Sequence, residues 1–232
     1  GTNNKGNGIS EGTIAMPYLS WEKERKIDVG IDLGMFNGAI DMTLDYFNNR
    51  RTDILLQRRT MLNVTGIRNA PWQNIGIVNS QGIEGSLNLK QKIGEVNLSA
   101  LGNFTYAKNK IIEYDEVPTA FEYQSITGRS LGKPYVYIAE GLYTPDDFDI
   151  IVDPTTGANS YTLKSHLPKP AANVMPGDIK YKDLNKDGSI NGDDRTRDND
   201  LYSQTPEIVY GFGLNAEWKG WFVGVFFQGV AH

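Results

Sequence analysis

The sequence contains no cysteine and only two histidines, His166 and His232, among its 232 residues. A disulfide framework, a thiol nucleophile and a cysteine-type zinc site are therefore excluded, as is a metal site built from several histidines. Lys and Arg number 23 against 28 Asp and Glu, which gives a net charge of −5. This acidic balance argues against the extended basic surface that nucleic-acid binding requires. The one basic cluster is interpreted as local, at strand ends or in a loop, and comprises Arg50, Arg51, Arg58 and Arg59.

Long apolar runs are also absent. No stretch of about 18 apolar residues occurs, so the sequence predicts no transmembrane helix. A membrane β-barrel stays possible, because its strands of about ten alternating residues average to a hydrophilic composition. The 25 glycines, 12 tyrosines and 4 tryptophans suit such a barrel and equally suit a soluble β-sandwich. We find no G-x-S-x-G, no H-E-x-x-H and no glycine-rich phosphate loop, and we expect no enzymatic activity.

What the sequence does contain is an alternation of apolar and polar residues with a period of two, typical of half-buried strands. It predicts three β-hairpins, over residues 26–46, 81–106 and 207–230. The first turns at Asn37-Gly38, the dipeptide most typical of tight hairpins, and the others turn at Gly94 and Gly220. We therefore predict an all-β, antiparallel fold.

The connections between strands are strongly unequal in length. Links within hairpins span two to four residues, whereas residues 48–75 and 108–205 form long links between hairpins. Consecutive antiparallel strands send alternate links to opposite ends, so all short turns share one end, as in outer-membrane barrels. In such a barrel the polar faces would line a water-filled lumen, whereas in a β-sandwich the same face would meet bulk water. The acidic residues expected to point into the lumen are Asp28, Asp32, Asp41, Asp45, Glu84 and Glu217. Aromatics near the predicted strand ends, which suggest a membrane-interface girdle, are Phe36, Tyr46, Tyr106, Trp218 and Trp221.

Residues 183–194, "DLNKDGSINGDD", have the layout of a calcium loop. Oxygen-bearing residues occupy positions 1, 3, 5, 7, 9 and 12, and Gly188 at position 6 permits a sharp turn. Hard oxygen donors at this spacing favour calcium, and the predicted ligands are Asp183, Asn185, Asp187, Ser189, Asn191 and Asp194. The prolines before the loop exclude the flanking helix of an EF-hand. We therefore expect a structural calcium ion that stiffens a long connection, with an acidic surface turn as the alternative.

Several motifs resemble the SusC/RagA family of TonB-dependent outer-membrane transporters. "LSWEKERKIDVGIDLGMFNGAIDMTLDYFNNRRTDILL" (residues 19–56) is similar to the family pattern of Trp-Glu, "vGiDlglfn" and "DYf.nrTtDlLl". Residues 74–90, 176–196 and 210–229 resemble three further family segments, in order and at plausible spacing. The similarity covers most of the chain.

This resemblance implies that residues 1–232 form part of the C-terminal half of a 22-stranded transmembrane barrel, without the plug domain and the final strands. It also implies import of oligosaccharides or peptides, a SusD-like surface lipoprotein, TonB as the energy-coupling partner, and contact with outer-membrane lipid. The 108–205 link would be extracellular, with weak ligand candidates at Tyr123, Tyr135, Tyr137, Tyr143 and Asn159. The alternative from the residues alone is a soluble calcium-stabilised β-sandwich that binds carbohydrate.

Overall fold

The computed structural model of the protein describes residues 16–60, 70–198 and 205–232. The chain divides into two compact units. Of the described residues, the sheet unit holds 16–60, 70–117, 126–132 and 205–232, and the loop unit holds 118–125 and 133–198. Within the described ranges, the only helices are short 3-10 turns, and no helix is long and apolar enough to cross a membrane.

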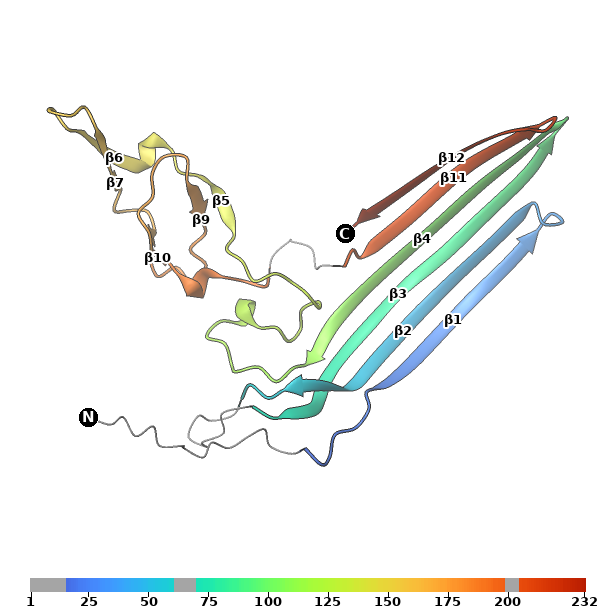
Figure 1. Ribbon diagram of the computed structural model, residues 1–232, viewed down its shortest axis with the longest axis horizontal. Coiled ribbons are helices and arrows are strands. Elements are labelled where there is room, and N and C mark those ends of the chain that lie inside the picture. The colour runs from blue at the N-terminus through green and yellow to red at the C-terminus, as the bar shows by residue number, and fades with distance from the viewer. Residues whose placement is uncertain (1–15, 61–69, 199–204) are drawn as a thin grey trace, which may run out of the picture. The chain divides into compact units, whose positions relative to one another are not determined.

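The sheet unit is built on six long strands in a single antiparallel sheet (Figure 1). Their order is β1-β2-β3-β4-β11-β12. Consecutive strands of the chain therefore pair with each other, except that β4 pairs with β11, because the short strands of the loop unit lie between these two in the sequence. The bounds are β1 Lys23–Met35, β2 Ile40–Gln57, β3 Trp72–Ile93, β4 Val96–Glu113, β11 Ile208–Trp218 and β12 Trp221–Ala231. The prediction of an all-β antiparallel fold is confirmed.

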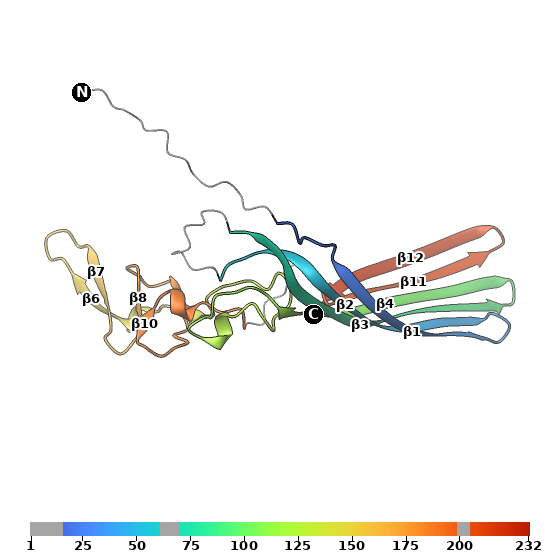
Figure 2. The ribbon, with the colours of Figure 1, turned by 90° about the horizontal axis from the view of Figure 1, so that it is seen from below.

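The three predicted hairpin turns occur where the glycines indicated and lie at one end of the sheet (Figures 1 and 2). Phe36, Asn37 and Gly38 all have positive φ, and that of Gly38 is 82°. Gly94 has φ 60°, and Lys219 and Gly220 both have positive φ. Such backbone conformations match the twist of a hairpin, and glycine adopts them without steric cost.

The pairing register places the predicted apolar residues on one continuous face. One row across the sheet runs Leu33, Met42, Leu87, Gly102, Phe212 and Phe227. These side chains stay open to the surroundings: Leu87 is 39% exposed and Phe212 49%. The six strands form one sheet and not two packed layers, which is not the arrangement that the β-sandwich alternative requires.

The strands extend further than the sequence pattern predicted. The long links were expected at residues 48–75 and 108–205, but β2 continues to Gln57, β3 begins at Trp72 and β4 reaches Glu113. The expected position of Tyr46 and Tyr106 near strand ends is therefore wrong, since both lie within strands. They lie instead in one row across the sheet, through Ile83. This row marks the end of the apolar face, as described below.

Asp115, just beyond β4, holds the chain segment that follows β2. Its carboxylate accepts hydrogen bonds from Arg58 Nε (3.1 Å), from the backbone N–H of Arg59 and Thr60, and from Thr60 Oγ1 (2.6 Å). Burial opposes the charge, but these hydrogen bonds prevail and lower the pKa of Asp115 to about 2. The ends of β2 and β4 are thus joined by an ionised side chain.

We predict that Asp115→Asn destabilises the folded protein by about 1–3 kcal/mol at pH 7, because hydrogen bonds to a carboxylate are lost. A folded pKa below the unfolded value of about 3.9 gives stability that is present above that value. It is lost as the pH falls from about 4 to about 2. Thermal unfolding of both proteins between pH 7 and pH 2 tests this; a difference that persists unchanged at pH 2 would contradict it.

The loop unit contains three two-stranded sheets and its own small core. The pairs are β5 (Ala139–Leu142) with β9 (Ile179–Tyr181), β6 (Phe148–Val152) with β7 (Asn159–Leu163), and β8 (Lys169–Pro170) with β10 (Ser189–Ile190). Figure 2 shows the β6–β7 hairpin. Tyr143 and Phe148 are buried and meet edge to face, with ring centroids 5.7 Å apart. Short strand pairs and a buried aromatic contact thus order a connection that has few regular elements.

Candidate functional site

The second face of the six-stranded sheet is polar and predominantly acidic. Asp45 lies directly opposite Glu84 in the register, and Asp41 lies opposite Asn88. The register puts all six acidic residues predicted to share one face on this side: Asp28, Asp32, Asp41, Asp45, Glu84 and Glu217. Gly30 faces Asp45 on the neighbouring strand, and a Cβ at that position would collide with the Asp45 carboxylate. Small residues therefore give the acidic side chains room on this face.

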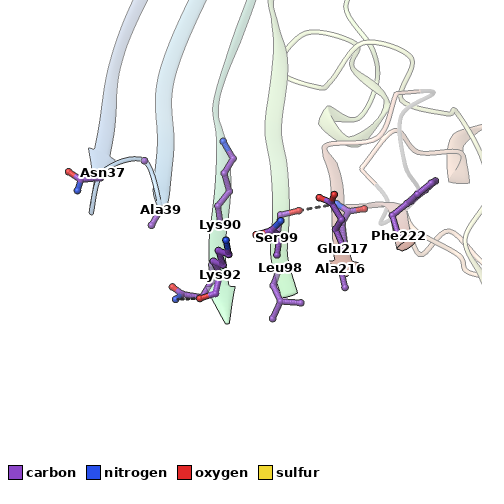
Figure 3. A pocket seen from close by; sticks show the side chains of 13 residues that line it. Asn37, Ala39, Lys90, Lys92, Leu98, Ser99, Ala216, Glu217 and Phe222 are labelled. Atoms are coloured by element: carbon purple, nitrogen blue, oxygen red, sulfur yellow. Dashed lines mark hydrogen bonds between the residues drawn. The ribbon is translucent and has the colours of Figure 1, made fainter. Parts of the chain in front are cut away.

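Near the hairpin turns, this face carries charges of both signs around a hollow of about 740 Å³ (Figure 3). Lys90 Nζ lies 3.9 Å from the Asp41 carboxylate, and Asn215 Nδ2 donates to Ser99 Oγ at 3.4 Å. Lys92, Asn97 and Glu217 also line the hollow. The period-two pattern of β3, β4 and β11 assigns all of these positions to the polar face.

Strand β12 departs from the alternation because it is apolar on both faces. Phe222 and Phe226 lie on the otherwise polar side, opposite Glu217 and Gly213. The Phe226 ring lies over Gly211 and Gly213. The sequence signal was the segment "WFVGVFFQGV", whose aromatic residues occur at both parities. The polar face therefore has an aromatic patch along one edge, which the alternation rule did not predict.

The predicted calcium ligands lie in one loop of the loop unit. Hydrogen bonds between residues of this loop hold its conformation. Asp183 accepts from the N–H groups of Lys186 (2.7 Å) and Gly188 (2.9 Å). Asn185 Oδ1 accepts from the Asp187 N–H, and Asp187 in turn accepts from the Ser189 N–H. Gly188 has φ 82°, as the sharp turn at position 6 requires.

Asp194, at position 12 of the loop, is fully buried and closes the loop at its base. Its two carboxylate oxygens accept the N–H groups of Leu184 and Asn191, each at 2.8 Å. Within residues 16–60, 70–198 and 205–232, no three Asp, Glu or His side chains converge as a metal-binding group. The residue types and the turn fit calcium, but the carboxylates lie in backbone hydrogen bonds and have not gathered around a common centre.

Tyr123 and Tyr135, two of the five ligand candidates, take part in packing around this loop. Tyr123 Oη donates to the Asp193 carbonyl at 2.8 Å. Burial raises the pKa of Tyr123, with further contributions from the charges of Asp194 and Asp193. The Tyr135 ring lies 4.3 Å from the Arg195 guanidinium and 4.8 Å from that of Arg197.

The remaining candidates differ in how much surface they offer. Tyr143 is only 3% exposed, so its ring is not open to a ligand in this conformation. Burial, and then the charge of Asp147, raise the pKa of Tyr143. Tyr137 packs against Tyr181 at 5.1 Å, and Asn159 is exposed, with its amide donating to Tyr161 Oη. The structure does not gather the five residues into one pocket lining.

Solved structures of the RagAB peptide importer share the fold of this chain. The RagAB peptide importer in its "open-open" state matches with a TM-score of 0.64 and 21% identity, over 95% of this chain and 22% of that one. Its "closed-closed" state matches with a TM-score of 0.60 and 23% identity. At this level of identity the likeness concerns the fold.

Sequence relatives agree with the structural match. TonB-dependent receptor P3 of Formosa agariphila is 25% identical over 96% of this chain, and TonB-dependent receptor P39 of the same organism is 28% identical over 97%. This chain spans 22% and 23% of the lengths of these two receptors. The family model described as "TonB dependent receptor-like, beta-barrel" matches residues 1–231. The chain therefore belongs to the TonB-dependent receptor-like β-barrel family, whose barrels lie in the outer membrane.

Proposed function

We propose that this chain forms part of the wall of a TonB-dependent outer-membrane transporter that imports oligosaccharides or peptides with a SusD-like surface lipoprotein. The observation that carries the proposal is the two-faced sheet. One face is continuously apolar from β1 to β12, the other is polar over most of its width, and every tight turn lies at one end. A barrel wall between lipid and a wet lumen needs this combination.

The height of the apolar face fits a membrane. On β11 it runs from Trp218 at the turn to Ile208, in the row of Tyr46 and Tyr106. Ten steps of about 3.4 Å make about 34 Å along the strand. With the strand tilt of 35–45° found in such barrels, this gives about 24–28 Å along the membrane normal, close to the roughly 25 Å apolar band of outer-membrane barrels. Aromatic residues border the band at both edges, as an interfacial girdle does.

The polar face would serve as the lumen wall along which cargo and water pass. Its acidic residues include the facing pair Asp45 and Glu84. Burying two like charges side by side is costly, so this face needs contact with water. Hydroxyl and amide side chains between them, such as Ser86 and Asn103, offer weak and exchangeable hydrogen bonds. Such a surface suits a polar cargo, which must bind to the lumen wall only weakly in order to be released from it. Both oligosaccharides and peptides have this character.

The alternation of β3 provides a matched test of which face meets lipid. Leu87 lies on the apolar face near the middle of the band, and its chain neighbour Ser86 lies on the polar face. We predict that Leu87→Arg destabilises the membrane-inserted full-length protein by about 2–4 kcal/mol, whereas Ser86→Arg is nearly neutral. Urea unfolding in lipid vesicles measures both. Equal effects, or a larger cost at Ser86, would mean that the faces are assigned wrongly.

Import itself is tested in the host with the full-length gene. Deletion should abolish uptake of a fluorescently labelled oligosaccharide or peptide pool and should leave uptake of small sugars and amino acids unchanged. Complementation with the wild-type gene should restore uptake, and loss of TonB should reproduce the defect. Unchanged uptake of both pools after deletion would contradict the import role.

We further propose that the loop at residues 183–194 binds a structural calcium ion. Support comes from the donor types at positions 1, 3 and 5 and from the left-handed Gly188. Binding would draw the Asp183 and Asp187 carboxylates, which now accept only local hydrogen bonds, around one cation. When bound, the ion would neutralise their mutual repulsion and restrain the loop between Tyr181 and Arg195.

We predict that Asp187→Ala abolishes calcium binding by this loop and speeds proteolysis within residues 160–198, to the rate seen for the wild type with chelator. Asp149→Ala, which removes the same charge from β6 outside the loop, is the control and should behave as wild type. Isothermal titration and timed proteolysis of the full-length protein measure both effects. Identical cleavage with calcium and with chelator in the wild type would contradict the proposal.

A further inference from the structure

The apolar face of the sheet ends abruptly at the Tyr46–Tyr106 row, and basic residues follow on the same face. Two positions beyond that row, the register aligns Ile27, Asn48, Gln81 and Lys108. Two positions further, it aligns Arg25, Arg50, Asn79 and Lys110. Neither row holds an acidic residue, but Lys108 Nζ lies 3.7 Å from the Glu207 carboxylate and is thus paired. The outward face thus changes from aliphatic to aromatic to cationic along the direction of the strands.

Arg25 and Arg50 form a like-charge pair across two strands, which is unfavourable unless an anion lies between them. Within the part of the chain that the structure describes, neither guanidinium makes an ion pair or a side-chain hydrogen bond. The next residue, Arg51, points to the other face and lies 3.8 Å from Glu22 and 4.0 Å from Glu24. Arg51 on the inner face is therefore paired, whereas Arg25 and Arg50 on the outward face have no counter-charge in the described chain.

The backbone of this pair lies a few Å beyond the headgroup zone of a bilayer, within reach of an arginine side chain. Arg50 is four residues beyond Tyr46, about 13–14 Å along the strand, or roughly 10 Å along the membrane normal at the usual tilt. The polar zone is about 5–8 Å thick on each side of the hydrocarbon core. Long arginine side chains extend several Å from the backbone and can reach back toward the interface. A guanidinium here meets headgroups and not acyl chains.

We propose that Arg25 and Arg50, with Lys110 on the same row, bind the phosphate of an anionic lipid headgroup in the outer leaflet. Guanidinium groups match phosphate with paired hydrogen bonds, and one phosphate between Arg25 and Arg50 relieves their repulsion. Lys110 lies two strands from Arg50, roughly 10 Å away, where it faces a further anionic group of the same lipid layer. Continuity with the lipid-facing band favours a lipid over a soluble anion. This inference rests on the membrane assignment proposed above.

The test uses the full-length protein in detergent with an equimolar mixture of phosphatidylglycerol and phosphatidylcholine, followed by native mass spectrometry. The wild type should retain phosphatidylglycerol preferentially. Arg25→Gln/Arg50→Gln should lower that preference by roughly fivefold per arginine, the equivalent of ~1 kcal/mol each. Arg51→Gln, which removes the same charge from the adjacent residue on the inner face, should keep the wild-type preference. Arg25→Lys/Arg50→Lys should retain part of it, because the charge stays but the paired hydrogen bonds are lost.

Each other outcome has a separate meaning. Equal retention by the double Gln variant and the wild type overturns the proposal, and so does an equal loss in Arg51→Gln. Displacement of the lipid by inorganic phosphate assigns the pair to a free anion and overturns the headgroup assignment. Failure of the membrane assignment looks different: the wild type and every variant would then retain neither lipid and would not enter phosphatidylcholine vesicles.

Discussion

Backbone pairing register is the constraint on which every other feature of the sheet unit depends. Side chains alternate between the two faces of a strand, so a slip of one residue would move an entire apolar set to the polar side. Six strands keep one register through the apolar band, and the shifts occur only beyond it, near Ile54 and Ile77. The tight turns help to fix that register, because Gly38, Gly94 and Gly220 permit only short, defined links. The apolar band, the acidic face and the basic rows are all consequences of this alignment.

The same alignment explains how much of the fold the sequence predicted. Where one face must be apolar, alternation is visible, and the three hairpins and their turns were located from it. Beyond Tyr46 the strand continues as "FNNRRTDILL", with polar residues on both faces and Asp53 at φ 57°. No hydrophobic pattern is needed there, because ladder hydrogen bonds to β3 hold the strand. The sequence analysis therefore predicted too short a strand for β2. For the same reason it placed Tyr46 near a strand end, whereas the tyrosine row lies within the strands.

The loop unit was less predictable because its contacts join residues far apart in sequence. The spacing of residues 183–194 located the sharp turn at Gly188, which has φ 82°. It did not indicate that Tyr123 would donate to the carbonyl of Asp193, 70 residues away, or that Tyr135 would lie against two arginines. Nor did it show that Asp194 would be buried under two backbone N–H groups, since burial depends on tertiary packing.

The most direct measurement of the central claim is the environment of alternate residues along β3 in a bilayer. This chain has no cysteine. With any cysteine elsewhere in the full-length protein replaced by serine, single cysteines at positions 83–90 can carry a spin label one at a time. In the vesicle-inserted full-length protein, the account predicts high oxygen and low nickel-complex accessibility at positions 83, 85, 87 and 89, and the reverse at 84, 86, 88 and 90. Uniform accessibility, or alternation of the opposite phase, would contradict a sheet with one face in lipid and the other in water.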